Sequence, residues 1–187
     1  MTIARFLAPL ALLGALVGCS DADRFAVQPP AVTETVRIAF RSVEVRDVSL
    51  PTYAASDEIA LQSEDGTVTS SSDVLWADEP ERAVALEVSR NLMRITGARI
   101  ASEPWPFEAY PDARLELRFA DMVASTDGTF RVSGQYFVGV PEGRGERSGL
   151  FDLSVPYDPS GGPSAIAQAR GRIIVDLSYF IAREALR

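Results

Sequence analysis

The sequence predicts an α+β fold in which an antiparallel or mixed sheet carries two helices packed on one face. Two long segments have the spacing of amphipathic helices, and several segments alternate apolar and polar residues as strands do. Their order is strands, helix, strands, helix, for which one layer of helices on a sheet is the simplest arrangement. The chain has 187 residues, 47% of them hydrophobic, which suits one globular domain.

The first strand is predicted over residues 35–40, where Val36, Ile38 and Phe40 alternate with less apolar neighbours. After residue 41 the apolar positions shift by one residue, to Val43 and Val45. Because side chains alternate between the two faces of a strand, this shift indicates a β-bulge or a change of pairing partner.

The first helix is predicted to begin near Pro80 and to end at Gly97. Asp78 and Glu81 have the spacing of a capping box, and proline fits the first turn of a helix. Glycine fits the left-handed position that ends a helix. The buried stripe of this helix consists of Val84, Val88, Leu92 and Ile95.

Further strands are predicted over residues 99–101, 115–119, 130–140 and 151–157, before a second helix over residues 164–186. Asp65-Gly66 and Asp127-Gly128 predict tight hairpin turns. Gly134 interrupts the segment 130–140 and indicates a bulge or a close approach of another group.

The composition excludes several classes of function. The chain has no histidine and no lysine, so it cannot build a Ser-His-Asp triad or a histidine metal site. Its single cysteine, Cys19, permits neither an intrachain disulfide nor a thiolate zinc site. A net charge of −8 argues against nucleic acid as a partner. A carboxylate-based enzyme, a binding module and a structural partner protein remain.

Motifs that resemble catalytic or ligand-binding sequences have simpler explanations. The glycine-rich stretch 143–149 lies between two predicted strands and is interpreted as a turn, not as a phosphate loop. The acidic groups at 57–58 and 78–81 could in principle hold calcium or act as an acid and base, but a solvated surface and a helix cap are the favoured explanation. We therefore predict no enzyme, no catalytic residue and no metal.

The amino terminus resembles a bacterial lipoprotein signal. Arg5 precedes the apolar stretch Phe6–Val17, which is shorter than the roughly 20 residues that span a bilayer. Leu16-Val17-Gly18-Cys19 then resembles the sequence at which the cysteine is acylated. We expect Cys19 to carry diacylglycerol and an N-acyl chain such as palmitate, and no other cofactor. Several acyl chains on one residue give firm membrane anchoring.

The predicted domains follow from this anchor. Residues 1–18 are the signal peptide, residues 19–33 are the lipidated cysteine with a tether, and residues 34–187 are a single periplasmic α+β domain. Within the tether, residues 24–27 include apolar side chains that can pack on the domain. Lipoproteins of the enteric type tend to stay at the inner membrane when Asp follows the cysteine. Ser20 occupies that place here, which favours the periplasmic face of the outer membrane.

Three aromatic residues are candidates for a partner interface: Tyr53, Trp76 and Trp105. Trp105 stands between two prolines, a frame in which a tryptophan is often a local packing plug. Exposed tryptophans, in contrast, are enriched where proteins bind a protein or a lipid surface. Both interpretations stay open for Trp76 and Trp105.

A succession of short motifs resembles the ABC-type transport auxiliary lipoprotein family of the PqiC type. The motifs are Leu50-Pro51-Thr52-Tyr53, Glu58-Ile59-Ala60, Trp76-Ala77-Asp78-Glu79-Pro80, Arg90-Asn91-Leu92, Glu103-Pro104-Trp105-Pro106 and the strand Asp112–Phe119. The sequence departs from the family pattern at residues 54–56, at Glu81 and at Pro104. The departures concern contacts made by those side chains and leave the expected fold unchanged.

The resemblance implies a non-catalytic partner of an MCE-domain protein and its inner-membrane transport complex. Such systems move lipids or other hydrophobic molecules between the two membranes and maintain envelope integrity. The resemblance also makes a homo-oligomeric ring plausible, since MCE proteins form rings. Two alternatives from other classes are an outer-membrane lipoprotein that regulates a peptidoglycan-synthesis enzyme and a periplasmic carboxylate hydrolase.

Overall fold

A computed structural model describes residues 22–141 and 143–187 of the chain. Three long antiparallel strands form the main sheet: β7 (Ala113–Ser125), β8 (Thr129–Gly139) and β9 (Arg147–Pro156). One end of β7 pairs in parallel with β2 (Ser42–Val45), which pairs with β6 (Arg99–Ser102). The other end pairs with β3 (Leu61–Gln62), which forms a hairpin with β4 (Val68–Thr69).

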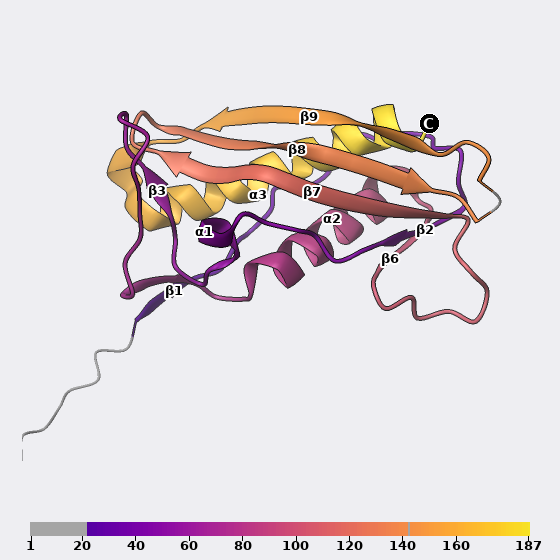
Figure 1. Ribbon diagram of the computed structural model, residues 1–187, viewed down its shortest axis with the longest axis horizontal. Coiled ribbons are helices and arrows are strands. Elements are labelled where there is room, and N and C mark those ends of the chain that lie inside the picture. Colours follow the sequence, from indigo (N-terminus) through magenta and orange to yellow (C-terminus); the bar gives the residue numbers. More distant parts are fainter. Residues whose placement is uncertain (1–21, 142) are drawn as a thin grey trace, which may run out of the picture.

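Two long helices cover one face of this mixed sheet (Figure 1): α2 (Pro80–Thr96) and α3 (Gly162–Phe180). A 3-10 turn (η1, Pro159–Gly161) precedes α3, a π-helical turn (η2, Ile181–Ala185) follows it, and α1 (Thr52–Ala55) is one short turn. The predicted fold class is confirmed. None of the helices within residues 22–187 that the structure describes is long and apolar enough to cross a membrane.

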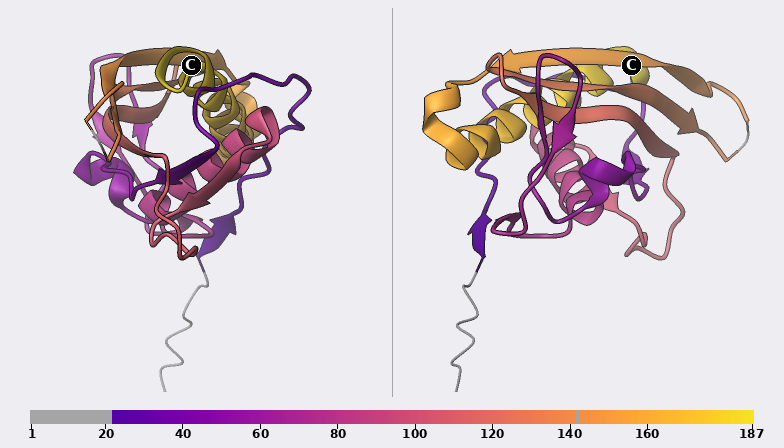
Figure 2. Two further views of the ribbon diagram at one scale, coloured as in Figure 1. Left: turned by 90° about the vertical axis from the view of Figure 1, so that its right-hand side faces the viewer. Right: turned by 60° about the vertical axis from the view of Figure 1, so that its left-hand side comes forward.

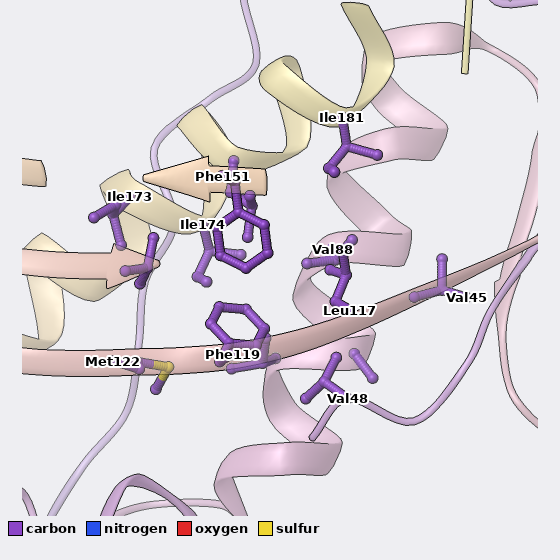
Figure 3. Packing of buried hydrophobic residues seen from close by; sticks show 14 of the residues in the cluster. Val45, Val48, Val88, Leu117, Phe119, Met122, Phe151, Ile173, Ile174 and Ile181 are labelled. Atoms are coloured by element: carbon purple, nitrogen blue, oxygen red, sulfur yellow. The ribbon is translucent and has the colours of Figure 1, made fainter. Parts of the chain in front are cut away.

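The core lies between the sheet and the two helices (Figure 3). Phe119 of β7 and Phe151 of β9 meet edge to face there, with ring centroids 5.1 Å apart. Val88 of α2 and Ile174 of α3 are fully buried in the same cluster. Each of these residues falls on the apolar stripe or strand face of its own element, so the periodicity in the sequence accounts for this core.

The ends of α2 only partly follow the prediction. Gly97 adopts the left-handed conformation (φ +69°) and donates to the Met93 carbonyl, as expected. The predicted capping box is absent from α2, because Glu79 is the N-cap residue and its side chain makes no capping hydrogen bond. Asp78 instead accepts a hydrogen bond from the Glu79 N–H, and the Glu81 carboxylate accepts one from the Leu50 N–H at 3.3 Å.

The strand predicted over residues 35–40 is wrong, although its apolar side chains do pack against the core. The backbone N–H of Val36 donates to the Ile95 carbonyl at 2.8 Å, and that of Ala39 donates to the Leu186 carbonyl at 2.7 Å. These donors therefore bind the ends of two helices rather than a neighbouring strand. The first strand of the main sheet is β2, which begins where the apolar positions shift.

The predicted turns and the Gly134 irregularity are confirmed. Gly66 and Gly128 lie in the two hairpin turns with φ of +87° and +85°. The β7–β8 register shifts between Phe119 and Asp121, opposite Gly134. A Cβ atom on Gly134 would lie 2.2 Å from the Arg118 carbonyl oxygen, so this position is both a bulge and a close backbone approach.

Residues 23–33, which we call the N-terminal strap, lie on the surface of the domain. The strap begins with β1 (Asp23–Phe25), which pairs in parallel with β5 (Val74–Trp76) as a separate two-stranded sheet. It then crosses α3 at Gly171, where a Cβ atom would lie 3.0 Å from the Gln28 carbonyl oxygen. Among the described residues, the pairing of the strap with the domain starts at Asp23, which is four residues after Cys19 in the sequence. Cys19 and the signal peptide lie outside the described residues.

Candidate functional site

The segment between β6 and β7, residues 103–112, forms an exposed loop rich in aromatic residues, which we call the aromatic loop. Its side chains Phe107 and Tyr110 are 43% and 83% exposed. Trp105 is half-buried beside Phe107, and the two rings meet edge to face with centroids 4.9 Å apart. The Trp105 indole N–H donates to the Ala109 carbonyl at 2.7 Å, which closes the loop on itself.

Buried or partly buried carboxylates hold the base of the aromatic loop. Glu44 of β2 is only 6% exposed; it accepts a hydrogen bond from the Trp105 N–H at 3.1 Å and pairs with the Arg114 guanidinium at 2.9 Å. At the other end of the loop, Asp112 accepts bonds from the N–H groups of Arg41 and Ser42 at 2.8 and 3.1 Å. The loop is therefore built on two charged anchors in the sheet, and its rings project from a defined base.

A groove of about 970 Å³ lies beside the aromatic loop, which we call the aromatic groove. Its lining includes Ile38, Phe40, Met93, Trp105, Tyr110, Arg37, Arg41 and Arg99. The guanidinium of Arg99 lies 5.1 Å from the centre of the Phe107 ring, a cation–π contact. A chain of net charge −8 thus places several arginines around its exposed aromatic rings.

A second unusual site is a cluster of three polar residues between α2 and α3: Glu87, Asn91 and Arg170, which we call the buried polar cluster. Arg170 is 1% exposed and pairs with the Glu87 carboxylate at 3.3 Å. Its guanidinium also lies 4.6 Å from the centre of the Trp76 ring. Burial raises the pKa of Glu87 and lowers the pKa of Arg170, because desolvation disfavours both charged forms.

The buried polar cluster adjoins a cavity of about 210 Å³ that the strap residues Phe25, Val27 and Pro29 help to enclose. Among the described residues, Glu87 Oε2, Asn91 Nδ2 and Arg170 Nε lie buried there without a hydrogen-bond partner in the protein. The ion pair therefore joins α2 and α3 directly beneath the strap. The sequence signal for Arg170 is its position four residues after the buried Ile166, on the inward stripe of α3.

The three aromatic candidates from the sequence do not come together. Trp105 belongs to the aromatic loop. Trp76 is 4% exposed and packs in the core beneath the Arg170 guanidinium, so it acts as a packing residue and offers no surface to a partner. Tyr53 is half-buried in α1, where its hydroxyl donates to Asp121 at 3.2 Å and burial raises its pKa. Phe107 and Tyr110, which the sequence did not single out, are more exposed than any of the three.

Among residues 22–141 and 143–187, no three His, Cys, Asp or Glu side chains gather in a way that would hold a metal ion. The described chain therefore has two distinctive features. One is the surface formed by the aromatic loop and its groove, and the other is the internal ion pair between Glu87 and Arg170.

Comparisons with known proteins agree with this fold. A family model described as "ABC-type transport auxiliary lipoprotein component" matches residues 25–182. Similar solved structures include an uncharacterized protein (TM-score 0.70, 19% identity, covering 86% of this chain and 97% of the other). A Xanthomonas campestris protein of the family DUF330 has a TM-score of 0.61 and 14% identity, over 86% of this chain and 91% of the other.

A PelC variant from Paraburkholderia phytofirmans, solved as a dodecamer, has a TM-score of 0.45 and 14% identity over 81% of this chain and 95% of the other. No curated protein matches the chain. At 19% and 14% identity, the uncharacterized protein and the Xanthomonas campestris protein show only that their fold is similar to that of this chain.

Proposed function

The chain belongs to the family of ABC-type transport auxiliary lipoproteins, and from this we propose that it is the lipid-anchored auxiliary component of an MCE-type transport system. In this role it binds an MCE-domain protein that works with an inner-membrane ABC complex. The cargo class is lipids or other hydrophobic molecules that move between the two envelope membranes. The protein itself contributes binding and positioning and catalyses no reaction.

The observation that carries this proposal is the extent of the family match, residues 25–182, directly behind the lipoprotein-like sequence that ends at Cys19. The match covers most of the strap, the main sheet and both long helices, so the family resemblance concerns nearly the whole domain. Acyl chains on Cys19 would hold that domain at the periplasmic face of the outer membrane, the location that Ser20 favours.

Purification in detergent tests the proposed partner. We expect the acylated protein, isolated with a carboxy-terminal tag, to bring down an MCE-domain protein of the same cell. An unrelated outer-membrane lipoprotein with the same tag is the control and should not bring it down. Recovery of peptidoglycan-synthesis enzymes without an MCE protein would contradict the proposal and favour the regulatory alternative.

We also propose that the protein forms a homo-oligomeric ring, and β9 supports this. Within the described part of the sheet, β9 pairs only with β8, so its other edge is open, and Leu150 on this strand is 72% exposed. An open edge strand is a ready site for pairing with another chain. Light scattering should show an oligomer for the wild type and a smaller species for Leu150→Arg. A wild-type monomer at all concentrations would contradict the ring.

A further inference from the structure

We propose that the aromatic loop is a second membrane contact, which touches the same lipid leaflet that holds the acyl chains of Cys19. The proposal rests on the proposed acylation, and it adds that the domain has a fixed membrane-facing side. Two features of the structure lead to it: the position of the loop relative to the start of the strap, and the side chains that the loop exposes.

The start of β1 and the aromatic loop lie on one edge of the molecule. In Figure 1 the strand β1 and the loop between β6 and β7 reach the lower edge at opposite ends of the long axis. The two views of Figure 2, which keep the vertical direction, show both at the lower edge again. A flat surface beneath the molecule would therefore meet the protein at these two places.

The proposed anchor at Cys19 limits how far the domain can lie from the membrane surface. Asp23 is the fourth residue after Cys19, and four extended residues span at most about 14 Å. The edge that carries β1 must thus lie close to the lipid headgroups. With one end of this edge attached, the opposite end meets the membrane whenever the long axis lies parallel to it.

The side chains of the aromatic loop suit the zone between water and hydrocarbon. Tryptophan and tyrosine are enriched at both membrane–water interfaces, because one end of the ring is apolar and the other can bind water. The loop places Trp105, Phe107 and Tyr110 together on a short exposed segment.

The charges around the loop favour phosphate headgroups. Arg99 stacks on the Phe107 ring at 5.1 Å, and the Arg41 side chain is 96% exposed beside the groove. The loop carries three carboxylates: Glu103 pairs with Arg46 at 3.4 Å, Asp112 pairs with Arg41 at 4.0 Å, and Glu108 is exposed to solvent between Phe107 and Tyr110. Arginines beside the rings can thus bind lipid phosphates while the rings enter the interface.

The two tryptophans make a direct test possible, since Trp76 is buried and Trp105 lies in the loop. The acylated protein is reconstituted into phosphatidylethanolamine vesicles that contain phosphatidylglycerol and a lipid with a nitroxide near the headgroup. We expect the nitroxide to quench the fluorescence of Trp105. The variant Trp105→Phe, which retains only Trp76, should lose this quenching.

Two further variants separate contact with lipid from other effects. Tyr110→Ser removes an exposed ring, leaves the base of the loop intact, and should reduce the quenching of Trp105 without changing the melting temperature. Val68→Ser is the matched control, because Val68 is an exposed apolar residue (37%) in the β3–β4 hairpin, whose turn reaches the upper edge in Figure 1. It should leave the quenching unchanged.

A chemically attached anchor distinguishes failure of this proposal from failure of the proposed function. Cys19 is the only cysteine, so the chain beginning at Cys19 can be coupled through its thiol to a maleimide lipid in the same vesicles. Quenching of Trp105 in this preparation supports the membrane contact even if the cell does not acylate the protein. Anchored protein that shows no quenching of Trp105 overturns the membrane contact. A shift of Trp105 emission that depends only on protein concentration also overturns it, because it would indicate that the loop binds a second copy of the chain.

Discussion

Arg170 is a charged residue that the fold buries almost completely. It is 1% exposed in α3, and it interacts with Glu87 of α2 and with the ring of Trp76, so one side chain joins α2, α3 and β5. A buried charge of this kind is costly unless it is paired, because the protein interior solvates ions poorly. The pair therefore specifies how the two helices and the strap fit together more than it adds net stability.

We expect Arg170→Met to lower the free energy of unfolding by about 3–5 kcal/mol, since it leaves the Glu87 carboxylate buried without its partner. The double variant Glu87→Leu/Arg170→Met should recover most of this loss, because it removes both charges and fills the site with apolar atoms. Urea denaturation of the three proteins measures both effects. A double variant as unstable as the single one would show that the pair itself supplies the stability.

The protonation of Glu87 makes a pH-dependent contribution. Because burial raises its pKa above the ordinary value of 4.5, the folded protein retains a proton that the unfolded chain has already lost. The contribution is therefore fully present below pH 4.5 and is lost as pH rises through the folded pKa. We expect wild type and Glu87→Gln to converge in stability at low pH, and wild type to become progressively less stable than the variant as pH increases. A difference independent of pH in urea titrations would contradict this.

At the scale of the elements, the irregularity in the β7–β8 pairing decides which residue can occupy position 134. Gly134 is required there because a Cβ atom would lie 2.2 Å from the Arg118 carbonyl oxygen and 2.7 Å from the Phe151 ring. Neither group can move freely, because the Arg118 carbonyl belongs to the strand backbone and the Phe151 ring is packed in the core. The long hairpin thus depends on one residue without a side chain.

Gly134→Ala should lower the free energy of unfolding by about 1–3 kcal/mol through overpacking. Gly139→Ala in the same strand is the matched control, because a Cβ atom there meets nothing within 4 Å, and it should change stability by less than about 0.5 kcal/mol. Thermal or urea unfolding measures both. Equal effects at the two sites would mean that the β7–β8 bulge can relax to accept a methyl group.

At the scale of the whole molecule, the proposed anchor at Cys19 and the proposed membrane contact of the aromatic loop would together give the domain a membrane-facing side and an opposite side. In Figure 1 the strand β1 and the aromatic loop lie on the lower edge, and β9 lies on the opposite, upper edge. A partner protein approaching from the periplasm would then meet the strands and not the loop. The proposed ring contact at the open edge of β9 is compatible with this orientation.

Membrane attachment and its location are separable in experiment. Cys19→Ser should release the protein from the membrane fraction, because the acyl chains are the proposed anchor. Ser20→Asp should retain the anchor and shift the protein toward the inner membrane, as Asp in that place tends to do in lipoproteins of the enteric type. Separation of the two membranes by density and mass spectrometry of residue 19 measure both. An unchanged distribution of Ser20→Asp would contradict the proposed sorting.

Local patterns predicted much of the fold but little of the candidate site. The helices, the hairpin turns at Gly66 and Gly128 and the close approach at Gly134 follow from interactions between residues near in sequence or paired across one hairpin. The strand predicted over 35–40 was wrong, because its alternation reflects packing beside helix ends rather than pairing with a strand. Of the aromatic candidates, Trp105 lies half-buried in the aromatic loop and its interface role stays a prediction, whereas Trp76 is buried in the core.

The sequence by itself determined the fold class, the two long helices, the hairpin turns and the family resemblance, and it placed a lone cysteine in a lipoprotein-like signal. These features depend on periodicity and short motifs, which act over a few residues. Only the tertiary structure decided that Arg170 is buried, that the strap lies on α3, and that the aromatic loop shares an edge with the start of β1. Those outcomes depend on which distant segments pack together, and neither propensity nor local spacing contains that information.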